Sequence, residues 1–185
     1  MSGPNAEDII AEINELRTNP RGYAQKIRQY KGYFSGNILR VPGSTVGIKT
    51  QEGPDAYEEA ATFLESADTQ AVCAFESSDG LTRVAQDFLQ AVTNTDPSRV
   101  GEINMEEIIA RHGEFTGNFS RAMEFGAGTS EQVVINLVVS DGDKARGQRD
   151  SLLNGGLKRV GVATGKHNTY RTCTVIVSCT KFTDK

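Results

Sequence analysis

The sequence lacks a long apolar run and an excess of basic residues, and each absence excludes a broad function. Its longest apolar stretch, residues 133–139, is far shorter than the roughly 20 residues that span a bilayer as a helix. The net charge of −4 and the isoelectric point near 5.3 give no electrostatic support for binding nucleic acid. With 37% hydrophobic and 24% charged residues in 185, the composition is typical of one globular domain.

Targeting signals are also missing from the first residues. The segment from Met1 to Asp8 has neither a basic stretch nor the apolar core of a secretory signal, and position 2 is not the glycine that myristoylation needs. Either the protein is cytosolic, or a leader was removed and a methionine added. We expect the first, a cytoplasmic protein without a transmembrane segment.

Cysteine is scarce and odd in number, which argues against a disulfide framework. Cys173 and Cys179 fall in one expected strand, about 20 Å apart at 3.3 Å per residue, so they are too distant to be joined. Cys73 has no neighbour at a metal-binding spacing. The three residues are expected to be small buried thiols in a reducing compartment.

Hydrophobic periodicity predicts an α+β domain, an α-β-α sandwich with a mainly antiparallel sheet and helices on both faces. Asn5 and Pro20 mark the starts of the first two helices. Residues 1–4 and 183–185 are interpreted as polar tails, and 1–185 as one domain. Helices are expected at 5–17, 20–33, 55–67, 79–93 and near 145–153, with a short one through Ile108 and Ile109 that ends near 112–113 and another that follows a cap at Thr129 or Ser130 and runs through Val138. Strands are expected at 119–125, 157–164 and 169–182, a hairpin-like excursion at 35–54 turning at Pro42-Gly43, and a polar loop at 95–103.

Several segments in register resemble the CAP/SCP superfamily, the cysteine-rich secretory, antigen 5 and pathogenesis-related proteins, in its protist and bacterial types. The similarity runs over nearly the whole chain, and it implies the α-β-α sandwich of that family. The segments are INELRTNPRGYA at 13–24, TQEG at 50–53 followed by EEA at 58–60, Leu81 with AQD at 85–87, and RGQR at 146–149 followed by VGVA at 160–163, His167 and Tyr170.

The resemblance implies a central cavity in which two histidines and two acidic residues suit a divalent metal. In this sequence those positions fall on Phe88, Arg121, Ser140 and Gln148, with Asp141 as an alternative register for the third. Phenylalanine offers no lone pair, arginine is a permanent cation, and glutamine is a weak ligand. The site is therefore expected to be degenerate, with no metal, no cofactor and no catalytic residue, and Phe88 is expected to pack in the core.

The function that follows is a non-enzymatic CAP/SCP-like domain, a structural or protein-binding module with protein partners. The resemblance implies one home for it, because intracellular domains of this type are built into protist flagellar microtubule assemblies; a cytoskeletal location and protein contacts at the polar ends are then expected. The alternative is a carrier of a lipid, a sterol or another small ligand, which the resemblance also implies. An enzyme is the least favoured hypothesis.

Three charged or titratable side chains have alternative roles. Arg121 could hold a carboxylate or phosphate ligand, but pairing with Glu124 or Asp141, or exposure to solvent, is the more ordinary interpretation. His112 and His167 adjoin glycine or turn residues, so an exposed or capping role is expected for both rather than catalysis.

Overall fold

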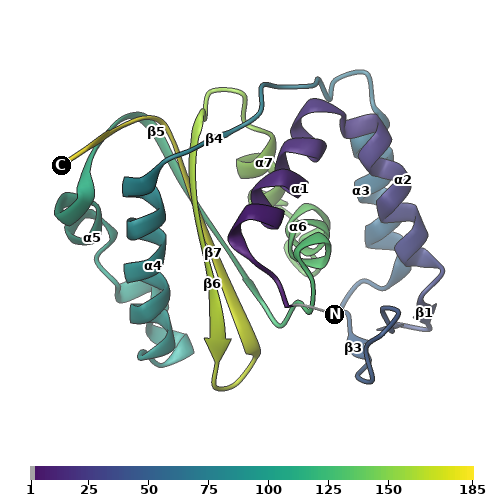
Figure 1. The fold of residues 1–185 in the computed structure, drawn as a ribbon. Helices are drawn as coiled ribbons and strands as arrows, with labels where there is room; N and C mark the ends of the chain where they lie inside the picture. Colours follow the sequence, from purple (N-terminus) through teal and green to yellow (C-terminus); the bar gives the residue numbers. More distant parts are fainter. Residues whose placement is uncertain (1–2) are drawn as a thin grey trace.

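A computed structural model describes residues 3–185, apart from the side chain of Pro97. One four-stranded sheet stands at its centre, and Figure 1 views it almost edge-on. Helices α4 and α5 cover one face; α1, α6 and α7 cover the other, with α2 and α3 as an outer layer (Figure 1). The elements are α1 (Ala6–Thr18), α2 (Pro20–Lys31), β1 (Phe34–Ser35), β2 (Ile38–Leu39), β3 (Ile48–Lys49), α3 (Pro54–Glu65), β4 (Glu76–Ser77), α4 (Asp79–Thr93), η1 (Pro97–Glu102), α5 (Met105–His112), β5 (Gly113–Phe125), α6 (Ser130–Val139), α7 (Gly147–Leu153), β6 (Arg159–His167) and β7 (Arg171–Asp184).

The main sheet has the strand order β4-β6-β7-β5. Its three longer strands are antiparallel, and Ile176 at the middle of β7 lies opposite Val162 on β6 and Ala122 on β5. Only the two-residue β4 runs parallel, beside the start of β6. Strands β1, β2 and β3 form a separate small antiparallel sheet. The expected α+β sandwich with helices on both faces is therefore confirmed.

Side-chain alternation on the strands divides the core into two apolar clusters. Val162 and Ile176 point to the cluster built with α1, α2, α3 and α6, whereas Ala163 and Val175 point to the cluster built with α4 and α5. Both clusters are nearly closed to solvent. The sheet is thus buried on both faces, which is why its strands are rich in apolar residues.

The first two helices begin where their capping residues and Pro20 predicted. The side chain of Asn5 accepts a hydrogen bond from the Asp8 backbone N–H at 2.9 Å, and Asn19 caps the second helix in the same way. Pro20 occupies the first turn of that helix, where its missing N–H costs nothing.

One glycine sets the distance between α4 and the sheet. A Cβ atom at Gly161 on β6 would lie 2.1 Å from the carbonyl carbon of Leu81 in the first turn of α4. No side chain fits into that space, so a substitution here would push the helix away from the strand.

The structure corrects four expectations about the elements. Residues 97–102 form the 3-10 helix η1 rather than a loop, and β4 was not predicted. Strand β5 begins at Gly113, six residues earlier than expected, with a β-bulge between Thr116 and Phe119. The excursion around Pro42 and Gly43 holds three short strands rather than a single hairpin.

The C-terminal tail is also corrected, because it belongs to the sheet. Thr183 pairs with Glu114, Asp184 pairs with Gly113, and the backbone N–H of Lys185 donates to the His112 carbonyl. Backbone pairing needs no apolar side chain, so the polar composition of the tail was misleading. At the other end, Met1 and Ser2 lie outside the described residues. No helix within 3–185 has the length and hydropathy needed to cross a membrane.

Candidate functional site

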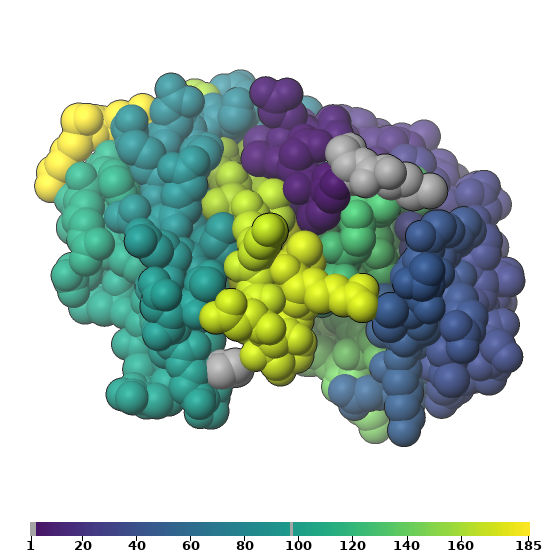
Figure 2. Space-filling model, turned by 60° about the horizontal axis from the view of Figure 1, so that its bottom comes forward, coloured from purple at the N-terminus to yellow at the C-terminus, as the bar shows by residue number. Residues whose placement is uncertain are grey.

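A cavity of about 290 Å³ lies where β5, α3, α6 and the segment 141–148 meet the excursion at 34–50. In the space-filling view from below, a hollow separates the β6–β7 turn from this excursion (Figure 2). The wall is divided about equally between apolar and polar residues, and three of the polar residues are acidic. Its residues are Leu39, Ile48, Thr50, Tyr57, Met123, Glu124, Phe125, Asn136, Leu137, Val139, Ser140, Asp141, Asp143 and Gln148.

Glu124 on β5 is the central ionisable group of this cavity, and only 7% of it is exposed. One carboxyl oxygen accepts a hydrogen bond from Asn136 Nδ2 at 2.9 Å, and the other accepts from the Ala127 backbone N–H at 3.3 Å. Burial raises the pKa of Glu124 to about 7, although both hydrogen bonds act in the opposite direction. Near neutral pH a large fraction of Glu124 is therefore an uncharged carboxylic acid with one O–H to donate.

Tyr57 on α3 brings a second group that burial keeps uncharged. Its ring stacks on Tyr30 at 6.3 Å between centroids and meets the edge of Phe34 at 5.1 Å. Burial, followed by the negative charges of Asp141 and Glu124, raises the pKa of Tyr57 above its ordinary value. The cavity thus holds a neutral phenol and a partly protonated acid within a wall of apolar and polar residues.

Two of the four positions that the family resemblance singled out line this cavity. Ser140 ends α6 in the left-handed conformation, with φ of 50°, and its hydroxyl donates to the Leu137 carbonyl at 2.8 Å. Gln148 on α7 accepts a hydrogen bond from the Met123 backbone N–H at 3.1 Å. Both side chains therefore bind neighbouring backbone.

The other two positions, Phe88 and Arg121, lie on the opposite face of the sheet. Phe88 is fully buried in the α4 cluster, as the sequence predicted, and the Arg121 guanidinium lies over its ring at 4.6 Å. Arg121 and Glu124 are three residues apart on one strand, so their side chains point to opposite faces. The four positions do not share a cavity, and Arg121 is not placed to pair with Glu124.

Glu124 itself was missed as a cavity residue, although the sequence held a signal for it. Phe119, Arg121, Met123 and Phe125 alternate along β5, and a glutamate between the last two must point to the other face. That face packs against α6, where Ala122 joins the first apolar cluster. An acid on a buried face is rare enough to indicate a functional role.

The segment 141–149 forms a firmly anchored wall beside the cavity. Both oxygens of Asp141 accept backbone N–H groups, from Gln51 at 2.7 Å and from Glu52 at 2.8 Å. Arg146 binds both carboxylate oxygens of Glu52, at 2.8 and 2.9 Å, and holds the pKa of Glu52 down at about 2. These bonds connect the segment to the chain just before α3 and keep the wall in place.

Arg149 makes a second anchor beyond the first. It is 1% exposed, its guanidinium binds both oxygens of Glu59 at 2.8 and 2.6 Å, and its Nε donates to the Val138 carbonyl. The bidentate geometry joins α7 to α3. Arg146 and Arg149 therefore hold the cavity wall on both sides of Gln148.

The two histidines have capping or pairing roles outside the cavity. His112 Nε2 lies 2.8 Å from Asp87 Oδ2. His167 is buried, with 7% of it exposed, whereas an exposed or capping role was expected. Its Nδ1 accepts the backbone N–H groups of Thr169 and Tyr170 in the β6–β7 turn, so the capping role is the one observed. Within residues 3–185, no group of three His, Cys, Asp or Glu residues is placed to hold a metal ion.

No family model and no curated protein matches the chain. Among solved structures, it is similar to an outer surface protein from Borrelia burgdorferi, with 12% sequence identity and a TM-score of 0.48. That alignment covers 82% of this chain and 100% of the other. The molecule is thus described by its own geometry, an α+β domain with a small cavity, lined by apolar and polar residues, around a buried acid.

Proposed function

We propose that the chain is a non-enzymatic CAP/SCP-type domain that binds a small, mainly apolar ligand in the Glu124 cavity. The observation that carries the proposal is a carboxyl group, 7% exposed, in a cavity whose wall also presents Leu39, Leu137 and Val139. Burying a carboxyl group costs free energy, and the two hydrogen bonds that Glu124 accepts do not prevent its pKa from rising. A ligand with one hydrogen-bond acceptor would use the acid's O–H while its apolar part contacts Leu39, Leu137 and Val139.

The size and the rim of the cavity support a ligand of lipid character. A volume of about 290 Å³ is at the lower end of ligand pockets, which run from about 300 to 1,000 Å³. It would hold the polar end and first part of a fatty acid or sterol. Ile48 lines the cavity and is 38% exposed, and Ile38 and Val46 on the same excursion are 39% and 41% exposed. These side chains would cover the part that emerges.

Binding is favoured over catalysis because the polar groups of the wall are committed to the protein. Asp141 accepts two backbone N–H groups, Gln148 accepts one, and the Ser140 hydroxyl donates to a carbonyl. A nucleophile or general base needs a free lone pair directed at substrate. These contacts support a binding site whose wall is rigid.

Titration with a fluorescent fatty acid and a fluorescent sterol, each at pH 6 and pH 8, tests the proposal. We expect binding of one probe to weaken about tenfold at pH 8, because the ionised acid loses its donor. Glu124→Gln, which keeps an uncharged donor, should bind equally at both pH values, and Glu124→Leu should bind weakly. Arg121→Ala, on the opposite face, is the matched control. Equal binding by all four proteins would place the ligand elsewhere.

A protein-binding role is a second proposal, and a different feature supports it. The expected dependence of the chain ends on partners loses its basis at the C-terminus, where Thr183 and Asp184 pair with β5. The feature that favours a partner is instead the open edge of β6.

A further inference from the structure

Strand β6 is covered on one edge for only part of its length. Strand β4 pairs with it at Arg159 and Val160 alone, after which the chain turns away into α4. On its other edge, β6 pairs with β7 from Arg159 to His167. In the sheet order of the described chain, β6 has no neighbours besides β4 and β7. Residues 161–167 therefore lack a strand partner on this edge; residues 161–163 are buried, and the edge reaches solvent at residues 164–166.

The register identifies which backbone groups face this edge. The Ser78 N–H donates to the Val160 carbonyl at 2.9 Å, so Val160 points toward β4. The Gly126 N–H donates to the Thr172 carbonyl, so even-numbered residues of β7 point toward β5 and odd-numbered ones toward β6. Both observations direct the N–H and C=O groups of Val162, Thr164 and Lys166 outward.

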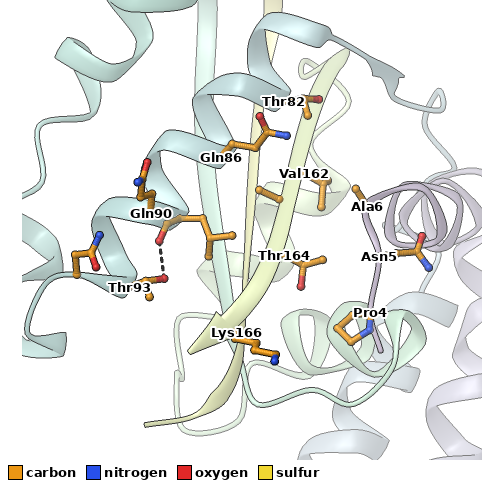
Figure 3. A pocket seen from close by; sticks show the side chains of 13 residues that line it. Pro4, Asn5, Ala6, Thr82, Gln86, Gln90, Thr93, Val162, Thr164 and Lys166 are labelled. Atoms are coloured by element: carbon orange, nitrogen blue, oxygen red, sulfur yellow. Dashed lines mark hydrogen bonds between the residues drawn. The ribbon is translucent and has the colours of Figure 1, made fainter. Parts of the chain in front are cut away.

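These groups lie along an open groove of about 730 Å³. Figure 3 shows Thr82, Gln86 and Gln90 of α4 on one side, and Pro4, Asn5 and Ala6 on the other, with β6 between them. The walls are mainly small or amide side chains. The lining residues are Pro4, Asn5, Ala6, Thr82, Gln86, Leu89, Gln90, Thr93, Asn94, Val162, Ala163, Thr164 and Lys166.

Charge at the groove is opposite in sign to that of the molecule. Lys166 is the single ionisable side chain among the lining residues, whereas the whole chain carries a net charge of −4. It is exposed, and it lies at the end of the groove nearest the β6–β7 turn (Figure 3). An acidic group is therefore favoured at this end.

We propose that the open edge of β6 at Thr164 and Lys166 accepts an extended segment of a partner polypeptide as an added strand, with an acidic side chain beside Lys166. Alternating outward N–H and C=O groups are matched in spacing by another polypeptide backbone. The amide and hydroxyl walls suit the polar side chains of such a segment. This surface is separate from the Glu124 cavity and does not depend on a ligand there.

The first test is amide hydrogen exchange in the purified protein. The N–H groups of Thr164 and Lys166 should exchange quickly, because both residues reach solvent and neither N–H pairs with β7. Those of Ala163 and Gly165, which face β7, should be protected at least about a hundredfold more. Equal protection of Thr164 and Ala163 would show that the edge is already covered, which would overturn the proposal.

The second test adds a synthetic peptide of about ten residues that alternates threonine and valine and ends in glutamate. In NMR spectra of the full chain, it should shift the amide signals of 162–166 and slow exchange at Thr164 about tenfold. The same peptide N-methylated at alternate residues should do neither, because it cannot donate along the ladder. No shift at millimolar peptide, or equal shifts with both peptides, would contradict the proposal.

Two variants place the contact on the strand edge. Thr164→Pro removes an outward N–H, which an edge strand tolerates, and it should abolish peptide binding with little change in melting temperature. Lys166→Glu should weaken binding of the glutamate peptide severalfold and should favour binding of a peptide that ends in lysine. If Thr164→Pro fails to fold, the Lys166→Glu variant still tests the proposal. An unchanged preference of this variant for the glutamate peptide over the lysine peptide would overturn it.

Discussion

The two faces of the central sheet differ in how they are held to their helices. On the α1 and α6 face, three charged side chains are buried: Arg17, Glu124 and Arg149. On the α4 and α5 face the buried cluster consists of apolar side chains and two cysteines, among them Phe88, Cys173 and Cys179. The same sheet thus uses polar anchors on one side and apolar contact on the other.

The difference between the two faces follows from how much of the backbone on each face lies in regular secondary structure. Arg17 is fully buried and donates to four backbone carbonyls, those of Cys73, Leu152, Asn154 and Leu157. Those carbonyls lie largely at the ends of elements and in the connections beside them, where no regular ladder satisfies them. The α4 face is formed by a 15-residue helix whose backbone bonds are internal. Buried charge is therefore found where the backbone is irregular, and the cavity forms on that face.

The largest effect expected is on the apolar face. Phe88→Ala should lower the free energy of unfolding by about 3–5 kcal/mol, because it empties the centre of a closed cluster. Arg121→Ala, which removes only the exposed cation over the same ring, should cost about 1 kcal/mol or less. Thermal and urea unfolding measure both, and similar losses for the two variants would mean that Phe88 is not a core residue.

A pH-dependent effect is expected on the polar face. The pKa of Glu124 rises from 4.5 to about 7 on folding, so its contribution favours folding most below pH 4.5 and declines until pH 7. Glu124→Gln should remove this decline, and its free energy of unfolding at pH 8 should exceed that of the parent by about 3 kcal/mol. Below pH 4.5 the two proteins should converge. Urea unfolding across this range tests it, and parallel curves would contradict burial of the acid.

The anchor beside the cavity should show a smaller loss. Arg149→Lys keeps the charge but loses the bidentate contact with Glu59 and the bond to Val138, so we expect a cost of about 2 kcal/mol. Arg99→Lys is the matched control, since the Arg99 and Glu102 side chains are 66% and 62% exposed, and it should cost about 0.5 kcal/mol or less. Equal unfolding midpoints for the two variants would count against a specific anchor.

The smallest expected effect comes from chemical labelling of the cysteine thiols, which leaves the fold intact. Cys73 is exposed, and Lys158 Nζ at 3.1 Å lowers the pKa of its thiol. Burial raises the pKa of Cys173 to about 12 and that of Cys179 to about 11. An aromatic disulfide reagent at pH 8 should label Cys73 alone in the native protein and all three in denaturant. Fast labelling of Cys173 would show that the apolar face opens.

The sequence pointed to some residues of the candidate site and not to others. Ser140 and Gln148, which the family resemblance assigned to a cavity, both line the pocket beside Glu124. Arg121 was placed there by register with a family pattern, and strand alternation puts it on the other face. Glu124 could be recognised only once the face of β5 that meets α6 was known.

The sequence by itself determined the helices and the long strands, since caps such as Asn5 and apolar spacing such as that around Phe88 are local properties of the chain. Tertiary structure alone decided the rest. Strand β4 has two residues and forms only because β6 lies beside it, and the polar residues Thr183 and Asp184 are ordered by backbone pairing with β5. Burial raises the pKa of Glu124 to about 7 where β5, α6 and the 34–50 excursion meet, and no local pattern encodes the meeting of such distant segments.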